Sequence, residues 1–262
     1  MHKVFVCYHH KNDQWYKNEL ISWAEKNQVF IDGSVGLGEI PEDWDDQKVR
    51  EHIRDEYLRD TTVTIVLVGT ETQYRKHVDW EIYSSMHDGK KNKKSGIIVI
   101  LLPSVKSDYY TCGFGNEKTA IYPEQQSWTS ITERTEFERR YPYMPARIID
   151  NLLKVGVNIS VINWDKLNVE NLRLMIDNAY DNRAKQDYDM SRPMRERNYN
   201  KQGQGTMKRK VFYSFHYAKD SWRAGQVRNI GVVEGDEPLT SNKWEEVKQK
   251  GDASILKWIQ CW

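Results

Sequence analysis

The sequence predicts an α/β fold in which a doubly wound parallel sheet of five strands is followed by a partial second α/β unit. The first observation behind this prediction is that apolar runs of strand length alternate with helical patterns through the first two-thirds of the chain. Such alternation is typical of right-handed crossovers around a parallel sheet. The second observation is that a motif near the N-terminus occurs again near the C-terminus.

The candidate strands are short and rich in β-branched residues, as expected for strands that are buried on both faces. The clearest are TVTIVLV at Thr62–Val68 and GIIVILL at Gly96–Leu102. In chain order, the five candidate strands are Val4–Tyr8, Val29–Ile31, Thr62–Val68, Ile97–Leu102 and Ile159–Ile162.

Helices are expected between these strands and after the last one, because residues that suit a buried helix face recur there at spacings of three and four. The segment Pro103–Arg139 shows no clear periodicity and is expected to carry little regular structure. The helical patterns are Tyr16, Leu20, Trp23 and Ala24; Val49, Ile53 and Tyr57; Val78, Ile82, Ser85 and Met86; Ile148, Leu152 and Leu153; and Leu172–Tyr180.

The repeated motif marks the start of two units. Lys3–Trp15 reads KVFVCYHHKNDQW and Lys210–Trp222 reads KVFYSFHYAKDSW, and each copy is an apolar run that stops at a histidine. This pattern suits a buried strand that leads to a loop at the edge of a sheet. We expect a first domain over residues 1–190, a polar linker over 191–206 and the opening part of a second such domain over 207–262. The second copy lacks a third strand, so we expect no catalysis from it alone.

Charge, cysteines and hydropathy exclude several classes of protein. The net charge of +1 predicts no binding to nucleic acid. The three cysteines, Cys7, Cys112 and Cys261, lack the spacing of a zinc site or a disulfide framework. No segment reaches the ~20 apolar residues of a membrane span and the N-terminus shows no signal pattern, so we expect a cytoplasmic protein without membrane contact.

A group of motifs indicates the family. YRKHVDWEIYSSM at Tyr74–Met86 follows a strand that ends in TIVLVG, and VFVCYHHKND, FIDGSV and IRDEYLRDTTVTIVLVG precede it. In combination, these motifs resemble the TIR domains, especially the bacterial TIR-like family of Thoeris antiphage systems. The resemblance covers roughly Met1–Asn200 as one unit, and Lys208–Trp262 as the opening of another. It implies a flavodoxin-like TIR fold for the first unit.

The resemblance also implies a reaction. In catalytically active TIR domains, a helix glutamate is essential for cleaving the bond between nicotinamide and ribose in NAD, and the matching residue here is Glu81. In the Thoeris family the product is typically a cyclised ADP-ribose signal that activates a downstream effector protein. NAD would then be a substrate, and no cofactor or metal is implied. The sequence leaves open whether the chain is a cyclase or a hydrolase.

A carboxylate suits this chemistry for a physical reason. Breaking the N-glycosidic bond builds an oxocarbenium-like cation on the ribose, which a fixed anion stabilises. Nicotinamide leaves as a neutral base, so one carboxylate can suffice. The alternative reading of Glu81 is an ordinary solvated helix glutamate. His77 lies one helical turn before Glu81, where related enzymes commonly have a tryptophan, and is a candidate substrate contact. Trp80 points elsewhere on the helix and is expected to pack.

Four further residues are candidate substrate contacts. Tyr8 and His9 follow the first strand, at the carboxyl edge of the sheet where open α/β folds bind ligands. The alternative is that Tyr8 closes the core and His9 begins a helix. Asp32 and Gly33 follow the second strand, at the position of the loop that lies over the active site in TIR domains.

A second function of another class stays open. A TIR-like domain that lacks the usual aromatic residue at position 77 could act as a non-catalytic scaffold for protein–protein interaction. The resemblance implies self-association through TIR domains for either function.

Overall fold

The computed structural model describes residues 1–33, 48, 53, 55, 58–89 and 93–198. The chain divides into two units, Met1–Gly203 and Gln204–Trp262. The second copy of the motif and most of the helix expected around Val49–Tyr57 lie outside the described residues. All described residues therefore belong to the first unit.

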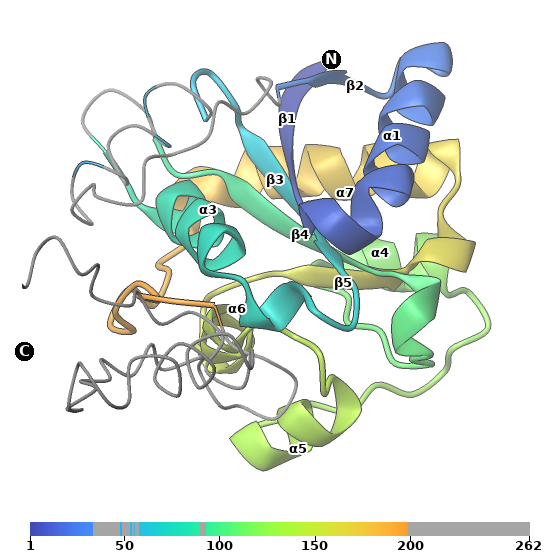
Figure 1. The fold of residues 1–262 in the computed structure, drawn as a ribbon. Coiled ribbons are helices and arrows are strands. Elements are labelled where there is room, and N and C mark those ends of the chain that lie inside the picture. Colours follow the sequence, from blue (N-terminus) through green and yellow to red (C-terminus); the bar gives the residue numbers. More distant parts are fainter. Residues whose placement is uncertain (34–47, 49–52, 54, 56–57, 90–92, 199–262) are drawn as a thin grey trace, which may run out of the picture. The chain divides into compact units, whose positions relative to one another are not determined.

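The first unit contains a parallel sheet of five strands in the order β2-β1-β3-β4-β5 (Figure 1). This confirms the predicted fold class. The non-sequential order places β3 at the centre, between β1 and β4, which is the doubly wound arrangement. The strands are β1 (His2–Cys7), β2 (Phe30–Asp32), β3 (Val63–Val68), β4 (Gly96–Leu101) and β5 (Ser160–Asn163).

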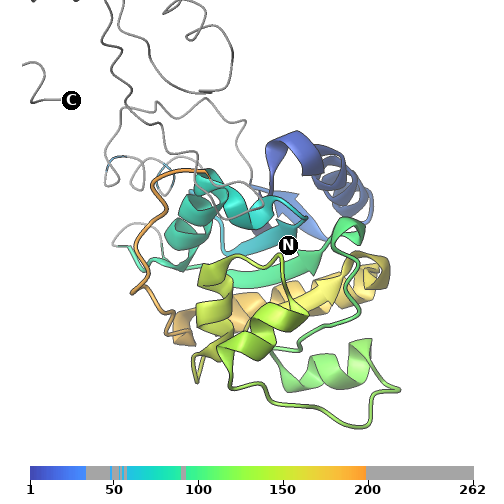
Figure 2. The same cartoon turned by 60° about the horizontal axis from the view of Figure 1, so that its bottom comes forward.

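Helices cover both faces of the sheet (Figures 1 and 2). Successive side chains of a strand point to opposite faces, so β1 contributes to two apolar clusters. Val4, Val6 and Tyr8 pack with α1 (His10–Lys26) and α7 (Val169–Asn182), whereas Phe5 and Cys7 pack with α3 (Lys76–Met86) and α6 (Ala146–Leu153). The layers place α3 directly beside the carboxyl half of β1.

The expectation of little regular structure over Pro103–Arg139 was wrong. The segment contains α4 (Gly115–Ile121) and α5 (Arg134–Arg140). These helices are short and each buries a single side chain, Glu117 in α4 and Phe137 in α5, so they leave no periodic pattern to read. The remaining short 3₁₀ helices are η2 (Thr72–Tyr74), η3 (Pro103–Val105), η4 (Trp164–Lys166) and η5 (Arg183–Lys185).

One glycine lets α7 approach the sheet closely. A Cβ atom on Gly96, the first residue of β4, would lie 2.2 Å from the backbone oxygen of Ala179 in α7. No real side chain fits at that distance, so the position requires glycine. The close approach helps to hold α7 against β4.

The segment of residues 187–198, which we call the C-terminal strap, follows η5 and crosses α6 and α3 (Figure 2). Residues 191–198 were expected to begin the linker, but they hydrogen-bond to both helices. The contacts of the first unit therefore continue at least to Asn198. Among the described helices, none is long and apolar enough to cross a membrane.

Candidate active site

The candidate site lies where the carboxyl end of β1 meets α3. Cys7 is the last residue of β1 and faces α3, and Glu81 projects from α3 toward it. The strand thus delivers the expected loop residues Tyr8 and His9 to the end of the sheet that holds Glu81. In open α/β folds this edge is the usual ligand-binding edge.

Glu81 is a buried carboxyl group, with only 5% of its surface exposed. Burial raises its pKa to about 7, because the charged form loses its hydration, and a hydrogen bond from the Cys7 thiol partly opposes this. The reading of Glu81 as a solvated helix glutamate does not fit this burial. A carboxyl group that titrates near neutral pH is common at functional sites.

Cys7 is a hydrogen-bond donor at this site. Its Sγ lies 3.8 Å from the backbone oxygen of Val78. Burial first, and the neighbouring Glu81 second, raise the pKa of the thiol well above its ordinary value. Cys7 therefore stays protonated at neutral pH, which suits a donor to Glu81 and does not suit a thiolate nucleophile.

Hydrogen bonds between α3 and β3 hold the helix face that carries Glu81. Ser85 lies one turn after Glu81, and its hydroxyl donates to the Glu81 backbone oxygen over 2.8 Å. Thr64 in β3 donates to the Ser85 hydroxyl, also over 2.8 Å. Both hydroxyl side chains are fully buried, so this chain of bonds connects the second half of α3 to the central strand.

Tyr8 and His9 are both largely buried, at 7% and 8% exposure. Tyr8 donates its hydroxyl to Gln14 over 2.7 Å, and its ring stacks on His10 at 4.5 Å. Burial raises the pKa of Tyr8, and the nearby Glu81 charge adds to the increase. This placement agrees with the alternative that Tyr8 packs in the core, and it also brings Tyr8 close to Glu81.

His9 directly precedes α1, in agreement with the alternative that it begins a helix. Burial, and then the charge of Arg75, lower the pKa of His9 to about 4, so the imidazole is neutral at pH 7. Its Nδ1 atom is buried and has no hydrogen-bond partner in the part of the chain that the structure describes. His9 could therefore accept or donate one further hydrogen bond after a small movement.

Asp32 and Gly33 lie at the carboxyl end of β2. The Asp32 carboxylate is 3.8 Å from the Lys17 ammonium group. Gly33 donates its backbone N–H to Val4 over 2.7 Å, and a Cβ on Gly33 would lie 2.5 Å from Thr61. Close packing therefore explains this glycine without a role in binding. The loop expected after it lies outside the described residues.

His77 and Trp80 lie in the first half of α3. His77 is exposed, and its ring meets that of Trp80 edge to face at 5.2 Å. Trp80 is only 5% exposed and donates its indole N–H to the Arg195 backbone oxygen over 2.8 Å. Trp80 thus packs, as expected. His77 lies one helical turn before Glu81, but the His77 side chain is exposed whereas that of Glu81 is buried.

Sequence reasoning missed a second buried carboxyl group at this edge of the sheet. Asp13 in the first turn of α1 is 4% exposed and accepts a hydrogen bond from Thr72 over 3.4 Å. The Thr72 hydroxyl in turn accepts from the Gly69 N–H over 2.8 Å. Burial raises the pKa of Asp13 to about 6. The signal was available, because this aspartate occurs in both copies of the repeated motif.

Within the described ranges, no group of three or more histidine, cysteine, aspartate or glutamate side chains could hold a metal ion. The site consists of the buried carboxyl groups of Glu81 and Asp13, a neutral imidazole at His9 and the hydroxyl of Tyr8. Such a set can hydrogen-bond sugar hydroxyls and stabilise a cation.

Comparison with known families supports this reading of the fold. Residues 5–107 match the family model described as "Thoeris protein ThsB, TIR-like domain". No curated protein matches the chain. The matched residues run from β1 through η3 and include α3 with Glu81. The chain therefore carries, over residues 5–107, a TIR-like domain of the Thoeris ThsB family.

Proposed function

We propose that this protein is an NAD-consuming enzyme of bacterial antiphage immunity in which Glu81 acts on the ribose. The Thoeris family belongs to antiphage defence. The observation that carries the proposal is the placement of Glu81: a carboxyl group beside the end of β1, 5% exposed, with a pKa of about 7.

The reaction follows from the chemistry of the bond. The bond between ribose C1′ and the nicotinamide nitrogen breaks, and its electron pair leaves with nicotinamide as a neutral base. The ribose then carries the positive charge, which the Glu81 carboxylate stabilises in a site of low dielectric. Ribose hydroxyls that donate to Glu81 favour its ionised form, which offsets part of the effect of burial. Tyr8 and His9 are proposed to contact the nucleotide.

The second half of the reaction decides the product. Water can capture the ribose cation and release a proton, which gives ADP-ribose. An internal nucleophile on the same molecule can capture it instead, which gives a cyclic product. We propose the cyclic ADP-ribose-type product as a signal for a downstream effector protein, because Thoeris systems act through such a partner. Self-association through the TIR-like domain is proposed as the route to the active form.

Incubating the full-length protein with NAD and separating the products by mass spectrometry tests the proposal. Glu81→Gln keeps the size of the side chain but removes its charge, so we expect a loss of at least ~100-fold in turnover. Glu117→Gln is the matched control. Glu117 is also a fully buried helix carboxyl group, but it bonds to Ser160 at the amino end of β5, the opposite edge of the sheet. Equal turnover by wild type and Glu81→Gln would eliminate the mechanism.

The pH dependence gives an independent check of the role of Glu81. The ionised carboxylate is the form that stabilises a cation, so kcat/KM should rise with pH through a midpoint near 7, the pKa of Glu81 in the free protein. Ribose hydroxyls that donate to Glu81 lower its pKa in the substrate complex, so kcat should rise through a lower midpoint. A turnover rate that falls as the pH rises through 7 would contradict the assignment.

The alternative is a non-catalytic scaffold, which is favoured by the histidine at position 77, where related enzymes commonly have a tryptophan. The same NAD assay separates the two functions. A scaffold would show no turnover at protein concentrations at which the chain self-associates, as measured by light scattering. It would also show no difference between wild type and Glu81→Gln in binding partners.

A further inference from the structure

The helix that carries Glu81 receives much of its support from the C-terminal strap. The residue before α3, Arg75, forms no capping hydrogen bond with its side chain. Instead, the first backbone N–H of the helix, that of Lys76, donates to the Asn198 side-chain oxygen over 2.9 Å. A helix end needs such partners, because its first N–H groups have none within the helix. Here the partner lies 122 residues further along the chain.

A buried ion pair also holds the first turn of the helix. Asp79 accepts two hydrogen bonds from Arg147 of α6, both of 3.0 Å, and a third from the backbone N–H of Arg195 over 2.8 Å. The Arg147 side chain is fully buried. It also donates to the backbone oxygens of Arg192 and Pro193, over 2.9 and 3.0 Å, and lies 4.9 Å from the Tyr83 ring. Arg147 therefore joins α6, α3 and the strap.

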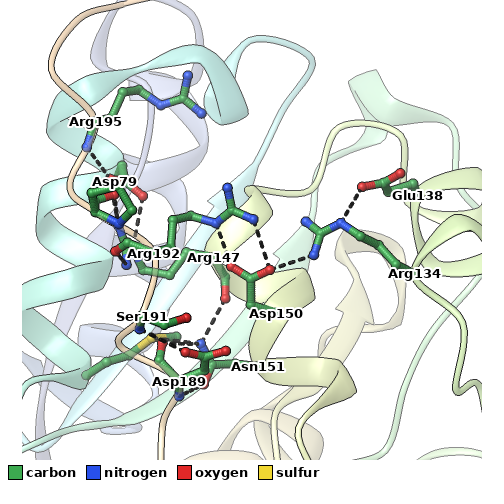
Figure 3. Close-up of polar contacts among 12 residues, drawn as sticks. Asp79, Arg134, Glu138, Arg147, Asp150, Asn151, Asp189, Ser191, Arg192 and Arg195 are labelled. Carbon is green, nitrogen blue, oxygen red and sulfur yellow. Dashed lines mark hydrogen bonds and ion pairs between the residues drawn. The ribbon is translucent and has the colours of Figure 1, made fainter.

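The strap is itself held by α6 (Figure 3). Asp150 accepts hydrogen bonds from the Arg192 side chain over 2.5 and 3.0 Å. Asn151 accepts from the backbone N–H of Asp189 over 2.7 Å and donates to its oxygen over 3.3 Å. The first part of the strap is thus fixed to α6, while its last part, through Arg195 and Asn198, reaches α3.

These contacts bear directly on Glu81 because of the geometry of a helix. Asp79, Trp80 and Glu81 are consecutive, and successive residues differ by ~100° around the helix axis and ~1.5 Å along it. Asp79 and Trp80 are held by the strap on one side, whereas Glu81 points to Cys7 on the other. A rotation of the first turn of α3 would therefore move the Glu81 carboxyl group relative to β1.

We propose that Asn198, Trp80 and the Asp79–Arg147 pair are positioning residues, through which the C-terminal strap holds the Glu81 carboxyl group at the end of β1. The effect of these residues on catalysis rests on the proposed function, whereas their effect on the position of the Glu81 carboxyl group does not.

Three variants of the protein and one matched control test the inference. Asn198→Ala removes the oxygen that caps α3, whereas Asn198→Asp keeps an oxygen acceptor there and should restore the wild-type behaviour. Trp80→Phe removes the bond to Arg195 but keeps an aromatic ring. Tyr188→Phe is the matched control, because Tyr188 also lies in the strap and its hydroxyl also donates a hydrogen bond, but to the Ser95 backbone oxygen beside the amino end of β4.

Two readouts are needed, and the first does not depend on turnover. The titration of Glu81 is followed by carbon NMR of glutamate labelled at the side-chain carboxyl, with Glu81→Gln to assign the signal. In wild type the midpoint should lie near 7. In Asn198→Ala and Trp80→Phe the carboxyl group moves toward water or other donors, so the midpoint should fall toward 4.5, the ordinary value. Tyr188→Phe and Asn198→Asp should keep the wild-type midpoint.

The second readout is NAD turnover. We expect Asn198→Ala and Trp80→Phe to lower kcat by ~10- to 100-fold with little change in KM, because misplacing a reacting group affects the transition state more than binding. Thermal unfolding by circular dichroism verifies that the variants remain folded. An unchanged Glu81 titration in both folded variants would overturn the inference. If the Glu81 titration shifts in the variants but the wild-type protein shows no NAD turnover, the positioning role would be supported and the proposed reaction would not.

Discussion

Replacing Glu81 by glutamine should change how the stability of the protein depends on pH. In the folded protein the carboxyl group has a pKa of about 7, compared with an ordinary value of 4.5 in an unfolded chain. Between these pH values the unfolded chain has released a proton that the folded protein still holds. The free energy of unfolding of wild type must then fall as the pH rises through this window. Glutamine stays neutral throughout, so Glu81→Gln lacks this contribution.

The size of the effect follows from the two pKa values. Their difference, taken at ~1.4 kcal/mol for each pH unit, corresponds to ~3 kcal/mol. Below 4.5 the side chain is neutral in both the folded and the unfolded protein, and the effect is absent. Above 7 it is complete. The variant should therefore gain ~3 kcal/mol relative to wild type between these limits. His9 and Asp13 also titrate in the folded protein, but they are present in both proteins and cancel in the difference.

The assay is urea unfolding of both proteins at a series of pH values from below 4.5 to above 7, followed by tryptophan fluorescence and circular dichroism. Coincident transitions by the two probes would justify a two-state treatment. The comparison at the acidic end is the internal control, because both side chains are neutral there. Parallel stability curves over the whole range would refute the argument, since they would mean that Glu81 is as well hydrated in the folded protein as in the unfolded chain.

Two further predictions concern the packing around the site. Arg147→Ala should lower the free energy of unfolding by ~3–5 kcal/mol, because it leaves the Asp79 carboxylate buried without the guanidinium group that pairs with it. Urea unfolding measures this loss. A loss below ~1 kcal/mol would mean that water replaces the guanidinium group. Gly96→Ala should lower it by ~1–3 kcal/mol or more, since the new methyl group would meet the Ala179 backbone at 2.2 Å. Gly115→Ala is the matched control, with no atom within 4 Å of the new Cβ, and an equal loss in both variants would contradict the packing argument.

Local patterns were sufficient to predict the sheet. Each expected strand overlaps an observed one: Thr62–Val68 differs from β3 by one residue at one end, and Ile97–Leu102 differs from β4 by one residue at each end. These strands are buried on both faces, so their sequences are continuous apolar runs that need no distant partner to be recognised. The helices α1, α3, α6 and α7 were equally visible, because each presents an apolar stripe to the sheet.

Short helices and polar contacts between distant residues were not predictable in this way. In α4 the buried residue is Glu117, held by the Ser160 hydroxyl over 2.6 Å and by Asn178, and a charged residue gives no sign of burial in a sequence. The Asp79–Arg147 pair joins residues 68 positions apart. Its members look like ordinary surface charges until the fold brings them together.

The sequence by itself determined the parallel sheet, the helices that cover it, and Glu81 as the candidate catalytic residue. Apolar periodicity is a local property, and the motif around Glu81, whose resemblance to TIR domains singles out this residue, is contiguous, so both can be read without coordinates. Only the tertiary structure decided that Glu81 is buried beside Cys7, and that the C-terminal strap caps and pins its helix. The physical reason is that burial, pKa and ion pairing depend on which distant groups exclude water from a side chain or replace it.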